Sequence, residues 1–461
     1  MNRRIPYRMV VFCLSAVLIL MVGCSQQQQK SGDVNKTQLA EQVRTEFLHA
    51  WNGYKEHAWG HDGLKPISGG YYDWYAEPFY MTALDAFDTM KLMGLDEEAR
   101  RAKELVLDSL DFDKDISVQA FEINIRLLGG LLSAYQMDGD ERFLELARDL
   151  GERLLPMFDS PTGMPYRFVN LRTGETSEAN SNPAEIGTLL LEFGTLSKLT
   201  GDPVFYDKSK QALVALYERR SDLDLVGSGI NVETGEWGQT ESHVGGFIDS
   251  YYEYLLKGWK LFGDQDCKQM WKTTIDALNR HVADTVDSGF WYGYVDMRTG
   301  EMTRPHFGSL HAFFPGVLAL DGDLERAKML QESCLKMWNL EGIEPELINY
   351  REMSIENATY YLRPEIMESA YYLYYYTGDQ QYLRMGETFL NGLMEHCKTE
   401  HGYAMLESVV TKEKQDKMES FFLAETLKYL YLLFAPEETL NLDEVIFNTE
   451  AHPLRNTWAQ G

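Results

Sequence analysis

The sequence predicts an all-α protein with small β-hairpins, folded as a closed ring of seven helix pairs, an (α/α)7 barrel. Two observations predict the helix pairs and the ring. Helix-turn-helix signals with a Gly or a Gly-Asp pair recur at intervals of 45 to 62 residues. The helices before these turns are apolar on almost every side, as at 186–199 and 366–376, which indicates burial. That burial favours a closed ring over an open solenoid.

The N-terminal residues are predicted to lie outside this fold. Arg3, Arg4 and Arg8 precede an uncharged apolar stretch, Met9–Val22, which is too short to span a bilayer. The stretch ends in MVGC, the pattern of a bacterial lipoprotein signal with Cys24 as the lipidated residue. An ordinary cleaved signal or a membrane anchor is the alternative. We expect a signal peptide at 1–23, a flexible tether at 24–40 and one catalytic domain at 41–461, lipid-anchored in the cell envelope on a membrane face that stays open.

The composition excludes some classes of partner. The signal holds three arginines and no acid, so its removal takes the formal net charge from −28 to −31. Such a surface repels nucleic acid and phosphates, and it suits a neutral ligand together with a bound cation. The chain has 27 Tyr and 9 Trp, which suit sugar faces as well as cores. We expect a monomer without a nucleic-acid partner.

The chain contains five cysteines. Cys13 and Cys24 belong to the signal, whereas Cys267, Cys334 and Cys397 remain, an odd number without metal-ligand spacing. We expect three buried, free thiols.

Each predicted helix pair turns at a glycine. A glycine suits the end of one helix, and an aspartate after it suits the start of the next. The turns are Gly94, Gly139-Asp140, Gly201-Asp202, Gly263-Asp264, Gly322-Asp323 and Gly378-Asp379, and a seventh follows Phe434.

Three similar segments interrupt the helices. They are VNLRTGET (169–176), INVETGEW (230–237) and VDMRTGEM (295–302). Alternating residues and a Thr-Gly turn predict a β-hairpin in each. Each precedes a candidate inner helix, so the hairpins are expected at the end of the barrel where the inner helices begin.

Carboxylates lie at a similar distance before most turns. Glu122, Glu185, Asp249 and Glu365 precede their glycines by 17, 16, 14 and 13 residues, and Glu425 precedes the last turn by about ten. A helix of that length rises roughly 20–25 Å, so these acids lie at the same end of their helices. Closing the ring therefore gathers at least five carboxylates at one mouth of the barrel.

The carboxylate cluster points to general acid/base chemistry or cation binding. An acid in a first helical turn often serves only the helix dipole, but these acids sit among large apolar residues without a solvated face. Two carboxylates that flank a glycosidic bond are the usual equipment of a glycosidase. The chain has no phosphate-binding Gly-rich loop, no G-x-S-x-G elbow and no paired His/Cys metal motif.

Long motifs follow one another between Phe47 and Leu454. They are FLHAWNGYKEHAWGHDGLKPIS (47–68), LDAFDTMKLMGL (84–95), FEINIRLLGGLLSAY (121–135), PAEIGTLLLEFGTLSKLTGD (183–202), DSYYEYLLKGW (249–259), LRPEIMESAYYLYYYTGD (362–379), MESFFLAETLKYLYLLF (418–434) and FNTEAHPL (447–454). Together they resemble glycoside hydrolase family 47, the class I α-1,2-mannosidases. The resemblance implies an (α/α)7 barrel that is closed by a C-terminal hairpin carrying FNTEAHPL.

The resemblance also implies roles for individual residues. Glu122 matches the family's proposed general acid, Glu365 its proposed general base, and Asp249 a third essential carboxylate whose part stays open. Thr449 matches a threonine that binds Ca²⁺ through its hydroxyl and carbonyl oxygens, with water completing the shell. Arg126, Glu185, Arg363, Glu368, Glu425 and Glu450 match residues that line the subsite of the released sugar or hold calcium-bound waters, and Phe421 matches an aromatic under the sugar ring.

The chain departs from the family pattern at several positions. In SLHAFFPG (309–316), Ala312 replaces the cysteine of the family disulfide, and Ser309 replaces a histidine. This segment is similar to the ER-degradation-enhancing mannosidase-like branch. Phe247 stands where endoplasmic-reticulum members carry an arginine that contacts glycan branches, so the branch preference stays open. Gly63 replaces an acid, with unclear effect.

The expected function is that of a lipid-anchored, inverting, calcium-dependent exo-α-1,2-mannosidase of the mannosyl-oligosaccharide 1,2-α-mannosidase type. Its substrates would be mannose-rich glycans such as N-glycans or yeast mannan. Two alternatives remain: a glycan-binding lipoprotein with the same pocket but little hydrolysis, and a structural α-toroid with a solvated acidic rim.

Overall fold

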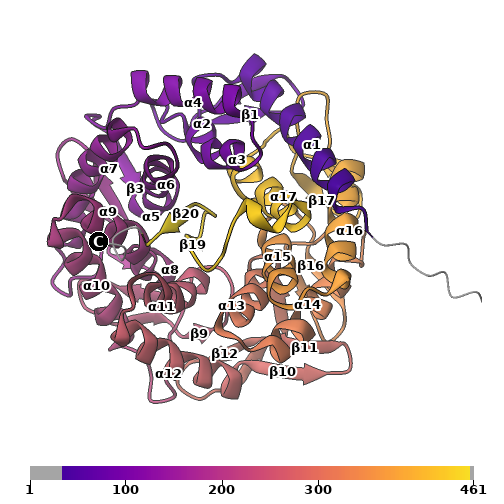
Figure 1. Ribbon diagram of the computed structural model, residues 1–461. Coiled ribbons are helices and arrows are strands. Elements are labelled where there is room, and N and C mark those ends of the chain that lie inside the picture. The colour runs from indigo at the N-terminus through magenta and orange to yellow at the C-terminus, as the bar shows by residue number, and fades with distance from the viewer. Residues whose placement is uncertain (1–33, 457–461) are drawn as a thin grey trace, which may run out of the picture. The chain divides into compact units, whose positions relative to one another are not determined.

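The computed structural model describes residues 34–456, and they form a ring of paired helices (Figure 1). The inner layer contains α2 (Met81–Asp85) and α3 (Phe87–Leu92), α5 (Ala120–Ile123) with the π-helical η1 (Asn124–Leu128) and α6 (Gly129–Asp138), α8 (Pro183–Gly187) and α9 (Leu190–Thr200), α11 (Asp249–Phe262), η3 (Ser309–Phe313) and α13 (Phe314–Asp321), α15 (Glu365–Thr377), and the π-helical η4 (Phe422–Thr426) with α17 (Leu427–Phe434). The outer layer contains α1 (Lys36–His57), α4 (Asp96–Ser109), α7 (Glu141–Leu154), α10 (Pro203–Tyr217), α12 (Gln265–His281), α14 (Leu324–Trp338) and α16 (Gln380–His396). These seven pairs confirm the predicted (α/α)7 barrel.

The turns between inner and outer helices have the predicted chemistry. Inner helices end at glycines in the left-handed conformation, for example Gly139 with φ +83°, where other residues are strained. At five of these turns the next residue is an aspartate whose side chain accepts a backbone N–H at the start of the outer helix. The capping aspartates are Asp140, Asp202, Asp264, Asp323 and Asp379.

The ring closes between the two ends of the described chain. The turn after Phe434 leads into a short 3-10 turn, η5 (Glu437–Thr439), and not into an outer helix. The outer partner of α17 is α1, and the two pack side by side (Figure 1). Helix α1 begins at Lys36, five residues before the boundary expected for the barrel, because Asn35 caps its first turn by accepting from the Gln38 backbone N–H.

Small antiparallel sheets line the end of the barrel where the inner helices begin. Each predicted hairpin pairs with a strand from the preceding unit, so the sheets join neighbouring helix pairs. The three-stranded sheets are β3 (Ser117–Gln119), β4 (Phe168–Asn170) and β5 (Thr176–Ser177); β6 (Asn180–Ser181), β7 (Gly229–Asn231) and β8 (Trp237–Gln239); β9 (Glu241–Ser242), β12 (Tyr294–Asp296) and β13 (Met302–Arg304); and β14 (His306–Gly308), β15 (Leu347–Asn349) and β16 (Ser354–Asn357).

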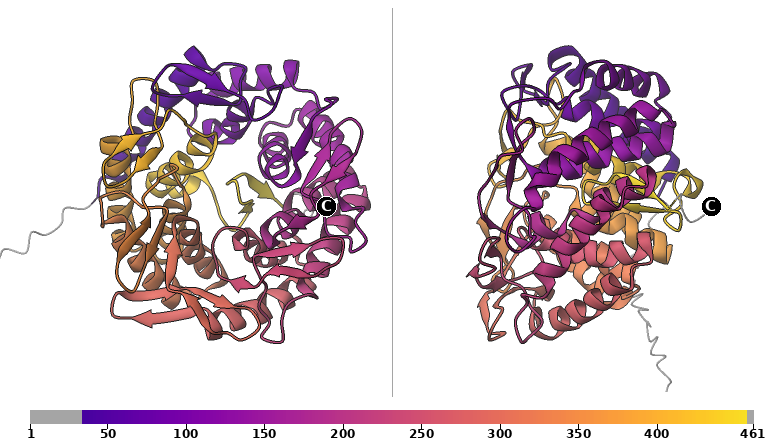
Figure 2. Two further views of the ribbon diagram at one scale, coloured as in Figure 1. Left: turned by 180° about the vertical axis from the view of Figure 1, so that it is seen from behind. Right: turned by 90° about the vertical axis from the view of Figure 1, so that its left-hand side faces the viewer.

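The remaining hairpins are two-stranded. They are β1 (Gly63–Lys65) with β2 (Gly70–Tyr72), β10 (Ala283–Val286) with β11 (Gly289–Tyr292), β17 (Leu406–Ser408) with β18 (Glu413–Lys414), and β19 (Val445–Phe447) with β20 (Pro453–Arg455). The last of these contacts the inner helices α6 and α11 and lies within the ring (Figures 1 and 2). The expected C-terminal hairpin is therefore present inside the barrel.

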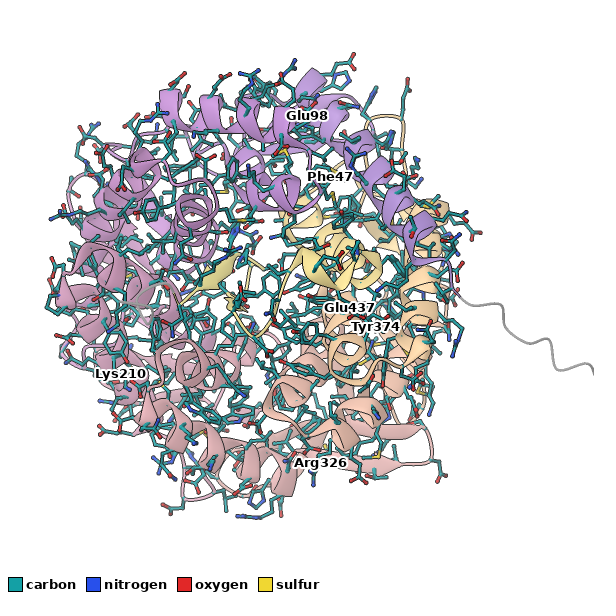
Figure 3. The ribbon with its side chains drawn as sticks, viewed as in Figure 1. Phe47, Glu98, Lys210, Arg326, Tyr374 and Glu437 are labelled. Atoms are coloured by element: carbon teal, nitrogen blue, oxygen red, sulfur yellow. The ribbon has the colours of Figure 1, made fainter. Side chains whose placement is uncertain are left out.

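The outer helices carry both buried apolar and charged side chains. Phe47 of α1 is fully buried, whereas Glu98, Lys210 and Arg326 lie on outer helices, at the periphery of the view in Figure 3. Glu98 and Lys210 pair with charged residues of neighbouring segments, Lys55 and Asp264.

Cys267, Cys334 and Cys397 are buried, free thiols, which confirms the prediction for this part of the chain. Among the described helices, none combines the length and apolarity that crossing a membrane requires. Cys13 and Cys24 lie outside the described residues, as does the predicted signal peptide.

Candidate active site

One cavity of about 320 Å³ opens at the hairpin end of the barrel. All eleven residues that the sequence predicts for the site line it, and they come from five inner helical segments and the C-terminal hairpin. They are Glu122, Arg126, Glu185, Asp249, Arg363, Glu365, Glu368, Phe421, Glu425, Thr449 and Glu450. The predicted convergence of distant acids is therefore present in the structure.

Glu122 and Arg126 belong to an inner helix that changes its pitch between them. Glu122 lies on α5, and Arg126 lies on the π-helical turn η1 that follows it. Arg126 Nε donates to Glu122 Oε2 at 3.0 Å, so the guanidinium orients the carboxyl group. A second π-helical turn, η4, carries Glu425. Single π-helical turns inside α-helices are frequent at functional sites.

Arg126 is the central cation of the cavity. Besides Glu122 it pairs with Glu450 of the hairpin, and its guanidinium lies 5.1 Å from the ring centroid of Trp74 and 5.7 Å from that of Phe421. Although burial acts against its charge, the surrounding carboxylates raise the pKa of Arg126 well above its usual value. The side chain thus ties the first inner unit to the C-terminal hairpin.

Asp249 and Glu365 begin two further inner helices. Burial raises the pKa of Glu365 to about 7, and Glu365 Oε2 is buried without a hydrogen-bond partner among the described residues. Burial likewise raises the pKa of Asp249 to about 6, although Asp249 Oδ1 accepts the Ser250 backbone N–H at 2.8 Å. A carboxylate with a pKa near neutrality is suited to accept a proton at working pH.

Two half-buried ion pairs stabilise the cavity walls. Arg363 donates to Glu346 Oε1 at 2.9 Å, and Ser309 Oγ donates to Glu346 Oε2 at 2.9 Å. Ser309, which the resemblance matches to a family histidine, is thus buried and fixed behind the wall. At α8, Arg167 Nε donates to Glu185 Oε2 at 2.6 Å.

The turn between β19 and β20 forms the floor of the cavity, which Thr449 and Glu450 line. The Thr449 backbone N–H donates to the Tyr254 hydroxyl at 3.2 Å. Asn448 Oδ1 accepts the backbone N–H groups of Glu450 and His452 at 3.0 and 2.8 Å. The turn is thus closed internally and attached to α11.

Buried polar groups that do not line the cavity hold this turn in place. His452 Nδ1 lies 2.7 Å from Asp88 Oδ2. Lys428 Nζ pairs with Asp88 Oδ1 at 2.6 Å and donates to the Ala451 carbonyl at 2.6 Å. Although burial disfavours its charge, Asp88 and Asp85 raise the pKa of His452 to about 9. We refer to Asp88, Lys428 and His452 as the turn clamp.

The inner helix packs closely against its neighbours at two glycines, Gly129 against the turn and Gly130 against Leu84 of α2. A Cβ atom on Gly129 would lie 2.5 Å from Asn448 Nδ2, and one on Gly130 would lie 3.0 Å from Leu84 Cγ. Glycine in a helix interior is unfavourable by itself, so the Gly-Gly pair is explained by this close approach.

The donor chemistry of the cavity fits a hard divalent cation. Within residues 34–456, no three His, Cys, Asp or Glu side chains form a metal-ligating group, so a cation at Thr449 would depend on that residue and on water. Burial raises the pKa of Glu368, Glu425 and Glu450, which face the same cavity. A divalent cation would offset their mutual repulsion, and oxygen donors are those that Ca²⁺ prefers.

Some lining residues escaped prediction. Glu253 lies one helical turn after Asp249 and pairs with Lys257 inside the barrel. Glu253 lies four residues after Asp249 on the same inner helix, and this spacing was a sequence signal that could have found it. Arg167 lies far before α8, whose Glu185 it contacts, and no sequence pattern marked it. Phe247 lies at the rim with 63% of its surface exposed and φ +75°.

Comparison with known proteins agrees with this geometry. The family model described as glycosyl hydrolase family 47 matches residues 46–456. The chain is 36% identical over 479 residues to alpha-mannosidase I MNS5 of Arabidopsis thaliana, covering 98% of this chain and 82% of the relative. It is 38% identical over 451 residues to the ER degradation-enhancing alpha-mannosidase-like protein 2 of Mus musculus, covering 90% and 77%.

A solved structure is also similar to this fold. The alpha-1,2-mannosidase from Trichoderma reesei superimposes with a TM-score of 0.85 at 27% identity, covering 92% of this chain and all of that chain. The family match over nearly the whole barrel and the carboxylate-lined cavity lead to one conclusion: the chain belongs to glycosyl hydrolase family 47.

Proposed function

We propose that this protein is an inverting, calcium-dependent exo-α-1,2-mannosidase that releases terminal mannose from mannose-rich glycans. The observation that carries the proposal is the meeting of Glu122, Asp249, Glu365 and Thr449 in one cavity with a closed floor. The name of the Trichoderma enzyme supports the linkage.

The cavity supplies the two carboxyl groups that glycoside hydrolysis needs. Glu122 gives a proton to the leaving glycosidic oxygen, and Arg126 holds its carboxyl group in place. Glu365 accepts a proton from the attacking water, which its pKa of about 7 suits. The new C–O bond forms on the face opposite to the one that the leaving group departs from, so the configuration at the anomeric carbon inverts.

Thr449 would hold Ca²⁺ through its hydroxyl and carbonyl oxygens, and Glu368, Glu425 and Glu450 would hold waters around the ion. When bound, the ion supplies electrostatic binding of sugar hydroxyls in the subsite of the released mannose. The chain itself provides Phe421 as an apolar platform for the sugar ring, with Arg126 beside it.

The proposal extends to the cellular setting. Cys24 would carry a lipid anchor in a bacterial cell envelope, and the barrel would act as a monomer. Radiolabelled palmitate incorporation that is lost in Cys24→Ser would support the anchor, and equal labelling of both proteins would contradict it.

A linkage comparison tests the activity. Purified protein is incubated with α-1,2-, α-1,3- and α-1,6-mannobiose, with and without chelator, and the anomeric configuration of released mannose is followed by NMR. We expect release from the α-1,2 compound alone, first as β-mannose, with loss of activity in chelator and recovery with calcium. Release of α-mannose as the first product would refute the inverting mechanism.

A further inference from the structure

A carboxyl group that the proposed mechanism does not use lies buried beside the site. Glu344 precedes β15, has no exposed surface, and neither of its side-chain oxygens has a hydrogen-bond partner among the described residues. It does not line the cavity. An isolated buried carboxylate is very costly, so a group in this position is neutral or has a hidden partner.

Among residues 34–456, the cation that acts on Glu344 is Arg363, and it already pairs with another carboxylate. The charges that act on Glu344 are those of Glu365, Glu346 and Arg363, and the Arg363 guanidinium is already engaged by Glu346 at 2.9 Å. The other titratable groups around it are Cys334 of α14 and Tyr360. Burial and the neighbouring Glu365 raise the pKa of Glu344 well above its usual value. Its surroundings therefore favour the protonated form of the carboxyl group.

Glu344 and Glu365 could complete each other's hydrogen bonding, one as donor and the other as acceptor. The protonated Glu344 carboxyl has an O–H to donate, whereas Glu365 Oε2 is a buried acceptor that has no partner among the described residues. The segments that carry the two carboxyls are joined by the Arg363–Glu346 pair at 2.9 Å, whose members lie two residues from Glu365 and from Glu344. Buried polar atoms are nearly always satisfied, by protein or by an internal water.

We propose that Glu344 is a positioning residue for the reaction: its neutral carboxyl group donates a hydrogen bond toward Glu365, directly or through one buried water, and so keeps the base ionised and oriented. This inference rests on the proposed function, in which Glu365 is the base. The arrangement resembles in principle a pair of carboxyls that share one proton, with the environments separating their roles.

Two substitutions separate this role from simple space filling. Glu344→Gln keeps the size and a donor N–H, whereas Glu344→Leu removes the donor. Gln331→Leu is the matched control, because Gln331 is a buried polar residue that donates to the Ile366 carbonyl at 3.1 Å beside the same helix turn. The measurement is kcat/KM for α-1,2-mannobiose against pH, whose acidic limb reports the base of the free enzyme.

We expect Glu344→Leu to move the acidic limb up by about one pH unit, about a tenfold loss on the acidic side, with a smaller change at high pH. Glu344→Gln and Gln331→Leu should leave the limb in place. A limb that moves down in Glu344→Gln would show that Glu344 is ionised in the working enzyme and would overturn the proposal. Unchanged limbs in both Glu344 variants, or an equal upward shift in Gln331→Leu, would also overturn it.

A second measurement needs neither activity nor the leucine variant. Infrared spectra of wild type and Glu344→Gln at pH 7 are compared for the C=O stretch of a protonated carboxylic acid. A band that is lost in Glu344→Gln supports the neutral donor, and its absence from wild type overturns it. If wild type releases no mannose at all, the proposed function fails, whereas the infrared result still decides the state of Glu344.

Discussion

Replacement of Lys428 by methionine should lower both the stability of the barrel and its affinity for calcium. Lys428 is fully buried and has two partners, the Asp88 carboxylate and the Ala451 carbonyl, each at 2.6 Å. Methionine fills a similar volume without a charge. Asp88 then retains His452 as its charged partner, and the Ala451 carbonyl loses its donor.

The magnitude follows from the burial of the pair. Removing one member of a buried ion pair costs about 3–5 kcal/mol, and Asp88 is here left with one cation, His452, in place of two. With an unfolding entropy of about 2.1 cal/mol/K per residue over roughly 420 residues, this lowers Tm by about 3–6 °C. Ala451 has φ +58°, a strained conformation that the clamp holds, so the turn with Thr449 should also relax. Loss of a group that orients a ligand typically weakens metal binding by about 10–100-fold.

The assay combines thermal unfolding with a calcium titration. Tm is measured in chelator, so that metal binding does not contribute, and the calcium affinity is taken from the dependence of Tm or activity on free calcium. The double variant Lys428→Met/Asp88→Asn is the control, because it removes the orphaned charge and should recover part of the lost stability. A single variant whose Tm and calcium affinity both equal those of wild type would refute the clamp.

Four further outcomes are expected. Glu365→Gln should lower kcat by at least about 100-fold with little change in KM, and mannose release at saturation measures it. Because Asp249 and Glu365 have pKa values of about 6 and 7 and Glu365 acts ionised, kcat/KM should fall as the pH drops through this range; a flat profile down to about pH 5 would contradict the assigned base. Thr449→Val should abolish the calcium-dependent rise of Tm while the far-ultraviolet circular dichroism stays unchanged. Gly129→Ala should destabilise by about 1–3 kcal/mol, seen in urea unfolding, because its Cβ displaces Asn448.

The parts of the fold that repeat locally were predictable from sequence. Glycine acts through its own backbone conformation and aspartate through a side-chain hydrogen bond to a nearby backbone N–H. Gly139 and Asp140 therefore mark a helix end and a helix start without any tertiary contact. The three hairpins were found for the same reason: Asn170, Asn231 and Asp296 each accept backbone N–H groups within their own turn.

A fourth hairpin of the same kind was missed. Strands β15 and β16 are joined by a turn in which Asn349 accepts the Arg351 backbone N–H, as in the other three. The turn lacks the Thr-Gly pair, and Met353 takes a positive φ of +52° in its place. Tertiary pairing with β14 enforces a conformation that the local sequence does not favour.

In the candidate site too, residues marked by a local sequence pattern were predictable and residues placed by distant contacts were not. The spacing of acids before the turns predicted Glu122, Glu185, Asp249, Glu365 and Glu425 at one mouth, because a helix converts sequence distance into height. The hairpin residues Thr449 and Glu450 came from family resemblance. The partners of the turn clamp are separated by more than 300 residues between Asp88 and His452, and no local pattern encodes such a contact.

The hairpin turn closes the described barrel beneath the cavity. Under the proposed function, a polysaccharide chain could not be threaded past this turn, so a terminal sugar would be the part that reaches Thr449. The freed monosaccharide would then leave by the mouth that the shortened glycan covers. Each round would end with release of the glycan, and trimming would be distributive, with every partly shortened intermediate accumulating in turn.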